Sequence, residues 1–248
     1  MRPLVVFIVV ALGGQLAVAQ PSPSVPVVVE LFTSEGCSSC PPADSLLSKL
    51  ANEQSVPGVQ IIPLGLHVTY WDQLGWKDPA SLARATERQR AYGEIWGGDR
   101  VYTPQAVIDG REELVGSDEN GVKRAIAKAA RQPRARVDLR AAIDGSRLHA
   151  EVTIADLPLD AKEPIETWIF VTEDGLASVV KRGENGGRTL RHDAVVRSVF
   201  GGDLAAARMR GFDTELRPEW RRDRLKAVAV LQGKRTHRIY GAATAPLK

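Results

Sequence analysis

The chain's two cysteines, Cys37 and Cys40, are separated by two serines and could form a disulfide, bind a metal ion or exchange a disulfide with another protein. They lie between an apolar run at 27–32 and a run with helical spacing at 43–51. At the start of a helix, free backbone N–H groups and the helix dipole stabilise a thiolate. The spacing also lets the second thiol resolve a mixed disulfide that the first has formed. The pattern therefore predicts a nucleophile at Cys37 and a resolving thiol at Cys40.

Two alternatives remain open for this pair. Cu(I) prefers soft thiolate ligands, which the two cysteines and a histidine could supply. In an oxidising compartment the pair could instead form a purely structural disulfide. A four-cysteine zinc site is excluded because the chain has only two cysteines. We expect no resident metal and no cofactor for the exchange reaction.

Two acidic residues near the cysteines are candidate proton carriers. Glu30 lies on the preceding apolar run and could relay a proton to or from Cys40, or it could simply pair with an arginine. Glu35 is an alternative that would lie closer to solvent. His192, far along the chain, is isolated from any ligand spacing and is a weaker candidate.

A second group of candidates follows the apolar run at 60–67. His67, Tyr70, Trp71 and Trp76 should emerge at the same edge of a sheet as the cysteines, because both runs would be parallel strands. His67 could act as a base or hydrogen-bond partner, and the aromatic side chains could form an apolar rim for an unfolded peptide. Alternatively, the aromatic residues only anchor a long insertion by packing.

The elements that must position these residues follow from periodicity. Up to residue 130 the pattern predicts strands at 27–32 and 60–67, helices at 43–51, 79–95 and 117–130, and a hairpin of 105–108 with 113–115. Beyond 133 the alternation predicts antiparallel strands at 136–143, 148–154, 167–172, 176–181, 194–200, 225–231 and 235–240. The Gly-rich segment 183–187 is a turn or loop. We therefore expect an α/β domain at 27–132 and a sandwich-like β-rich domain at 133–248.

The order strand, Cys-x-x-Cys, helix, strand, helix, followed by Thr103-Pro104 and a hairpin, resembles the thioredoxin fold. This resemblance implies a cis Pro104 after Thr103, facing Cys37 as part of the site. Four stretches resemble a family of secreted bacterial, thioredoxin-like proteins catalogued as domain of unknown function 1223. They are VELFTSEGCSSCPPAD, HVTYWDQLGWKDP, RVYTPQAVIDGR and GENGGRTLRHDAVVR. That family implies a fold and a compartment but supplies no activity, substrate or direction of electron flow.

The N-terminus predicts export. Arg2 precedes an apolar run at 4–12, and Ala17-Val18-Ala19 fits a cleavage site, so residues 1–19 read as a signal peptide and 20–26 as a flexible leader. We expect a periplasmic or secreted protein with no membrane attachment after cleavage. The net charge of +3 is spread without a basic patch, which argues against nucleic acid. The expected partners are protein thiols or disulfides, and the β-rich domain could form a homodimer.

Overall fold

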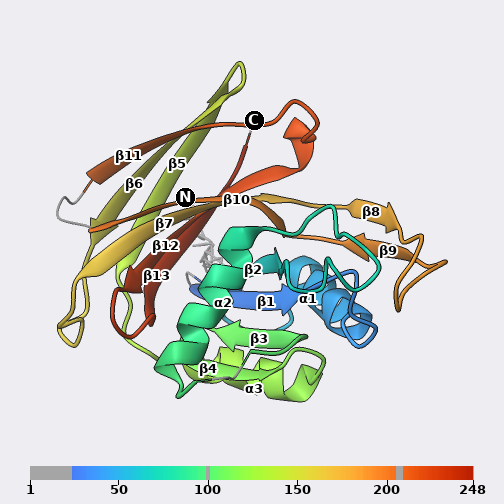
Figure 1. The fold of residues 1–248 in the computed structure, drawn as a ribbon. Coiled ribbons are helices and arrows are strands. Elements are labelled where there is room, and N and C mark those ends of the chain that lie inside the picture. The colour runs from blue at the N-terminus through green and yellow to red at the C-terminus, as the bar shows by residue number, and fades with distance from the viewer. Residues whose placement is uncertain (1–23, 99–100, 205–208, 248) are drawn as a thin grey trace, which may run out of the picture.

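The computed structural model describes residues 24–98, 101–204 and 209–247 (Figure 1). The helices are α1 (Pro41–Glu53), α2 (Ala83–Ile95) and α3 (Glu119–Ala129), with a 3-10 turn at Arg222–Arg224. The strands are β1 (Val25–Thr33), β2 (Val59–His67), β3 (Gln105–Ile108), β4 (Glu112–Val115), β5 (Arg136–Asp144), β6 (Arg147–Ala155), β7 (Ile165–Glu173), β8 (Leu176–Val179), β9 (Thr189–His192), β10 (Val195–Leu204), β11 (Met209–Glu215), β12 (Leu225–Gly233) and β13 (Ile239–Pro246).

The N-terminal segments expected from the sequence fall mostly outside this description. The signal peptide predicted at 1–19 and the leader residues up to 23 are not among the described residues. β1 already includes Val25 and Pro26, which the sequence pattern places in the leader. Among the described residues, no helix is both long enough and apolar enough to cross a bilayer.

The expected fold class, a thioredoxin-like α/β domain followed by a separate antiparallel β domain, is wrong. The described chain is mostly β, and one mixed sheet holds eight strands in the order β13-β12-β7-β10-β2-β1-β3-β4. Strands from both halves of the chain therefore share one sheet. Only three α-helices accompany it among the described residues. The prediction failed because periodicity identifies strands but does not say which of them pair.

The two halves of the sheet join at a single point. β10 pairs with β2 through Val195 and Gly65, and the Gly65 N–H donates to the carbonyl of Ala194 at 2.8 Å. Beyond that point β10 continues as the antiparallel partner of β7, and β12 and β13 follow. The remaining strands beyond residue 133 form a three-stranded sheet, β11-β6-β5, and the separate hairpin β8-β9.

The alternation of residues along β1 decides what each face of the sheet contacts. Val27, Val29 and Leu31 lie in an apolar cluster with residues of α1 and α3. Val28 and Phe32 point the other way, into a cluster that contains residues of α2, β7 and β12. The β11-β6-β5 sheet packs on the β7-β12-β13 region through further apolar clusters, forming the upper layer in Figure 1.

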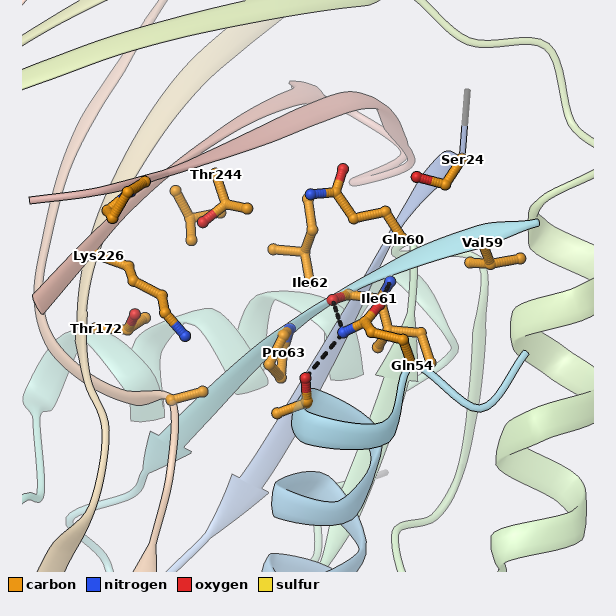
Figure 2. Close-up of a pocket in the computed structure, with 14 residues that line it drawn as sticks. Ser24, Gln54, Val59, Gln60, Ile61, Ile62, Pro63, Thr172, Lys226 and Thr244 are labelled. Carbon is orange, nitrogen blue, oxygen red and sulfur yellow. Dashed lines mark hydrogen bonds between the residues drawn. The ribbon is translucent and has the colours of Figure 1, made fainter. Parts of the chain in front are cut away.

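A cavity of about 660 Å³ opens where β2 diverges from the strands of the second half (Figure 2). Here the outer edge of β2 lacks a strand partner, and the Gln54 side chain takes over this role. Its amide donates to the carbonyl of Ile61 at 3.1 Å and accepts from the Ile61 N–H at 2.7 Å. Pro63, two residues along, has no N–H to satisfy. The charged lining residue, Lys226, is paired with Asp174, and none of the residues predicted to do chemistry lines the cavity.

Candidate functional site

Cys37 and Cys40 form a disulfide with their Cα atoms 5.4 Å apart. The bond lies in the turn between β1 and α1, as the sequence predicts, and α1 begins directly after it at Pro41. Cys40 itself has helical angles (φ −77°, ψ −36°), so the two prolines that follow do not delay the helix. The proline pair occupies the first turn, where a missing N–H leaves no hydrogen bond unmade.

Both cysteines are fully buried, whereas Ser38 and Ser39 between them are exposed. The segment that contacts this turn is residues 181–188 of the loop between β8 and β9, which we call the cover loop. Figure 1 labels the two strands that it connects. Asn185 donates from its side-chain amide to the main-chain oxygens of Glu35 and Cys37, at 2.9 Å each. The disulfide is therefore enclosed by a segment that lies almost 150 residues away in the sequence.

A cluster of ionisable side chains is buried beside the disulfide turn. Its members are Glu35, Asp44, His67, Asp78 and His192. His67 Nδ1 lies 2.7 Å from Asp78 Oδ2, and the rings of His67 and His192 meet edge to face at 4.8 Å. His192 links to Glu35 at 3.6 Å and to Asp44 at 3.8 Å. These five groups therefore form one continuous buried network.

The charges in this network follow from burial and pairing. Burial alone would lower the pKa of His67, but the charge of Asp78 and the hydrogen bond to it outweigh burial and raise that pKa to about 9. Burial would raise the pKa of Asp78, but His67 holds it at about 2. His67 and Asp78 therefore form a charged pair at neutral pH.

Asp44 behaves differently, because burial raises its pKa more than His192 and His67 lower it. Asp44 Oδ2 and His192 Nε2 are both buried and have no hydrogen-bond partner among the described residues. Within that part of the chain, no group of three or more His, Cys, Asp or Glu side chains is arranged to hold a metal ion. Asp44 Oδ2 is thus available to carry a proton.

The cis peptide bond implied by the resemblance is confirmed at Thr103-Pro104. Pro104 lies beside the start of α1: a β-carbon added at Gly116 would be 3.2 Å from the Ala43 β-carbon and 3.4 Å from that of Pro104. Thr103 accepts a hydrogen bond from Trp71 Nε1 at 2.9 Å. That Pro104 faces Cys37 stays a prediction.

The structure places three of the second group of candidates, His67, Trp71 and Trp76, around the disulfide turn. Trp71 packs on Gly36, where an added β-carbon would lie 3.2 Å from the Trp71 β-carbon. Trp76 donates from Nε1 to Glu35 Oε2 at 2.8 Å. Both tryptophans and Tyr70 are partly exposed, whereas His67 is buried. The two tryptophans can therefore border an approaching partner, but the buried His67 cannot touch one in this arrangement.

Glu30 is placed elsewhere. It lies on the α2 face of β1, where it forms an ion pair with Arg88 and accepts a hydrogen bond from the Tyr92 hydroxyl at 2.6 Å. Arg88 also donates to Gln232 at 2.9 Å. These partners favour the alternative interpretation of Glu30 as a carboxylate paired with an arginine.

Three residues of the site were not predicted to act there. Asp44 stands four residues after Cys40 in a run with helical spacing, so the i, i+4 relation was a usable signal. Asp78 accepts from the Glu35 N–H at 2.8 Å, and Asn185 bridges Glu35 and Cys37, but both do so across long separations in sequence. Both lie in stretches that carry the family resemblance, HVTYWDQLGWKDP and GENGGRTLRHDAVVR, but nothing local in those stretches assigns them to the disulfide turn.

With this geometry established, a family model described as protein of unknown function (DUF1223) matches residues 28–232. The chain belongs to this family. The match covers the disulfide turn, the buried cluster and the cover loop, so all three lie within the DUF1223 region. A comparison with curated proteins finds no match.

Two solved structures are similar to this DUF1223 chain over most of its length. The protein AGR_C_4864 from Agrobacterium tumefaciens is 25% identical, with a TM-score of 0.67 over 89% of this chain and 94% of the other. HBP35 of Porphyromonas gingivalis is 17% identical, with a TM-score of 0.66 over 92% of this chain and 77% of the other. The second likeness is one of fold alone.

Proposed function

We propose that the protein carries out thiol-disulfide exchange on protein substrates through Cys37 and Cys40. The buried ionisable cluster beside the disulfide is the observation that supports this proposal. A disulfide that only staples a turn needs no ionisable neighbours, and burying five of them costs free energy that pairing only partly recovers. Clusters of buried groups with shifted pKa values are typical of sites that move protons.

The exchange requires a proton at a defined place. A partner's thiolate attacks Sγ of Cys37, a new disulfide joins the partner to Cys37, and the old bond breaks to leave Cys40 as a thiolate. That thiolate then takes up one proton. In the reverse direction Cys40 must first lose its proton, and its thiolate then displaces the partner from Cys37.

Asp44 is the proposed proton carrier for Cys40. The two residues are four apart at the start of α1, so their side chains lie on the same face of the helix. The raised pKa of Asp44 favours the protonated acid, which can give its proton to a neighbouring thiolate. His192, 3.8 Å from the Asp44 carboxylate, connects it to the His67-Asp78 pair.

We further propose that the protein works outside the cytoplasm, in the periplasm or as a secreted protein, on protein thiols or disulfides. The signal peptide predicted at 1–19 is the basis for this placement. An oxidising compartment would keep the Cys37-Cys40 bond formed between rounds of exchange.

The first prediction concerns Cys40→Ser. The reduced variant is mixed with a model peptide whose single cysteine carries 5-thio-2-nitrobenzoate. We expect Cys37 to displace one nitrothiobenzoate anion and the reaction to stop at a stable mixed disulfide, because no resolving thiol remains. The reduced native protein should instead release the peptide as a free thiol. Mass spectrometry and the absorbance of the anion measure both outcomes.

Cys37→Ser is the matched control and should trap less peptide than Cys40→Ser. The native protein is also titrated against glutathione mixtures. A disulfide that stays closed well below about −300 mV, together with no trapped peptide on Cys40→Ser, would show that the bond is structural. Stoichiometric Cu(I) binding that needs both cysteines would favour the copper alternative instead.

The second prediction concerns Asp44→Asn. We expect release of the peptide by Cys40 to slow by about 10²-fold, because the amide cannot accept the Cys40 proton. Attack by Cys37, read from the first burst of nitrothiobenzoate, should change little and serves as the internal control. Stability should not fall at neutral pH, because burial penalises the ionised carboxylate of Asp44. Equal release rates in the variant and the native protein would exclude Asp44 as the carrier.

A further inference from the structure

The disulfide cannot be reached by a protein partner in this arrangement. Attack requires a thiolate to approach a sulfur atom, but both cysteines have no exposed surface. Of residues 181–188, only Asn185 is buried, and it is fully so. The cover loop therefore acts through one inserted side chain.

Hydrogen bonds to main-chain atoms hold this loop on the disulfide turn. Asn185 donates to the oxygens of Glu35 and Cys37, and the carboxylate of Glu184 accepts from the Ser38 N–H at 2.9 Å. Arg188 donates to the Asn185 side-chain oxygen at 2.8 Å and orients the amide. The loop also packs on Trp76, because a β-carbon added at Gly183 would lie 3.3 Å from the Trp76 β-carbon. Hydrogen bonds made by a loop that is otherwise exposed can open at low cost in free energy.

Hydrogen bonds within the β8-β9 loop also hold the shape of the cover loop, independently of its contacts with the disulfide turn. The Gly186 N–H donates to the carbonyl of Gly183 at 3.0 Å, and the Gly187 N–H donates to that of Val180 at 2.8 Å. These bonds would remain if the loop moved away from the disulfide turn. Its departure would leave the Glu35 carbonyl and the Ser38 N–H without these partners next to the nucleophile, while the Cys37 carbonyl would keep the Cys40 N–H at 3.3 Å.

The pattern of that backbone indicates what could replace the loop. Glu35 and Cys37 offer carbonyl acceptors, and Ser38 offers an N–H donor. An extended polypeptide presents N–H and C=O groups along its length, which is the complement of such a stretch. Asn185 and Glu184 supply the same groups from within the chain.

We propose that the cover loop occupies the binding site of an extended polypeptide on the backbone from Glu35 to Ser38, and that Asn185 must leave before the disulfide reacts. This inference rests on the proposed function and names the partner of the same site. A partner's main chain replaces Asn185 and Glu184, and its sulfur then reaches Cys37. The loop thus excludes thiols that cannot make these backbone contacts.

The first experiment measures access to Cys37 without any protein substrate. In the Cys40→Ser background, Cys37 reacts with 5,5′-dithiobis(2-nitrobenzoate), forming a mixed disulfide and releasing one nitrothiobenzoate anion. Adding Asn185→Ala should raise the rate about tenfold or more, because two hydrogen bonds that close the loop are lost. Asn185→Asp, which keeps the shape but removes both donors, should do the same.

Lys181→Ala is the matched control, since Lys181 is exposed in the same loop and takes no part in these contacts. Its rate should equal that of Cys40→Ser alone. Circular dichroism checks that each variant is folded. Equal reaction rates in all folded variants would show that Asn185 does not restrict access to Cys37. That result leaves exchange intact if Cys40→Ser still traps a peptide, so the two failures can be told apart.

The second experiment tests the nature of the partner through amide hydrogen exchange at Ser38, measured by NMR. Glu184→Ala in the Cys40→Ser background should expose the Ser38 N–H and speed its exchange. Trapping a cysteine-containing peptide on Cys37 should restore protection, because the peptide main chain supplies an acceptor. Trapping cysteamine, which has no peptide backbone, should not. If the peptide and cysteamine adducts protect the Ser38 N–H equally, the backbone from Glu35 to Ser38 is not a polypeptide-binding site.

Discussion

Replacing Gly110 with alanine is expected to destabilise the protein by at least about 4 kcal/mol or to prevent folding. Gly110 has φ +62°, which costs an alanine about 1 kcal/mol. Its added β-carbon would also lie 1.9 Å from the carbonyl oxygen of His237, which is far inside contact distance. Because this obstacle is a backbone atom, the turn between β12 and β13 would have to move.

That movement would break further bonds at the same place. The Ile239 N–H donates to the carbonyl of Asp109 at 2.9 Å, and the buried Asp109 carboxylate accepts from the Val28 N–H at 2.8 Å. Asp109 is also ion-paired with Arg134, in the segment that leads to the second half of the chain. The cost therefore includes contacts that join the two halves.

Gly145→Ala is the matched control for backbone strain. Gly145 has nearly the same angle, φ +59°, but an added β-carbon there meets nothing within 4 Å. We expect it to cost about 1 kcal/mol. Urea denaturation of both variants gives the comparison. Costs that agree within about 1 kcal/mol would mean that the β3-β4 turn does not pack on the β12-β13 turn.

Only the part of the fold that depends on local spacing could be predicted from the sequence. The β-α-β-α order with its hairpin follows from local spacing, as in the run of Leu46, Leu47 and Leu50 on one face of α1. The pairing of Val195 with Gly65, which joins both halves in one sheet, leaves no local trace. The second half was therefore predicted as a separate domain, although four of its strands, β7, β10, β12 and β13, complete the same sheet.

The candidate site likewise has residues that the local sequence predicts and residues that only folding brings together. Cys37 and Cys40 could be predicted because the two cysteines and the strand and helix that flank them are close in sequence. The cis bond before Pro104 was predicted from the resemblance to the thioredoxin fold. Asp78 and Asn185 were missed because each meets the disulfide turn only after the chain has folded. A local pattern can indicate a reactive pair, but the groups that control its protons and access come from distant segments.

Replacing Asp78 with asparagine is expected to remove about 3 kcal/mol of stability between about pH 4 and pH 6.5. The pKa of His67 is raised from 6.5 to about 9, so the stabilisation by its charged form is complete below pH 6.5 and disappears as the pH rises to 9. The pKa of Asp78 is lowered from 3.8 to about 2, so its contribution is complete above pH 3.8 and disappears as the pH falls to 2. The stability difference between the native protein and the variant should therefore decline on both sides of that window.

Asp213→Asn is the matched control, because Asp213 pairs with His149 on the surface, where the two side chains are 57% and 49% exposed. An exposed pair of the same residue types should contribute less than about 1 kcal/mol. Urea denaturation across pH 3 to 9.5 measures both variants. A difference for Asp78→Asn that stayed constant over this range would mean that the pair is not charged. If the stability difference between the native protein and the variant declines above pH 6.5 for Asp78→Asn but not for Asp213→Asn, His67 holds its proton at neutral pH. The network that contains Asp44 then carries a positive charge on His67.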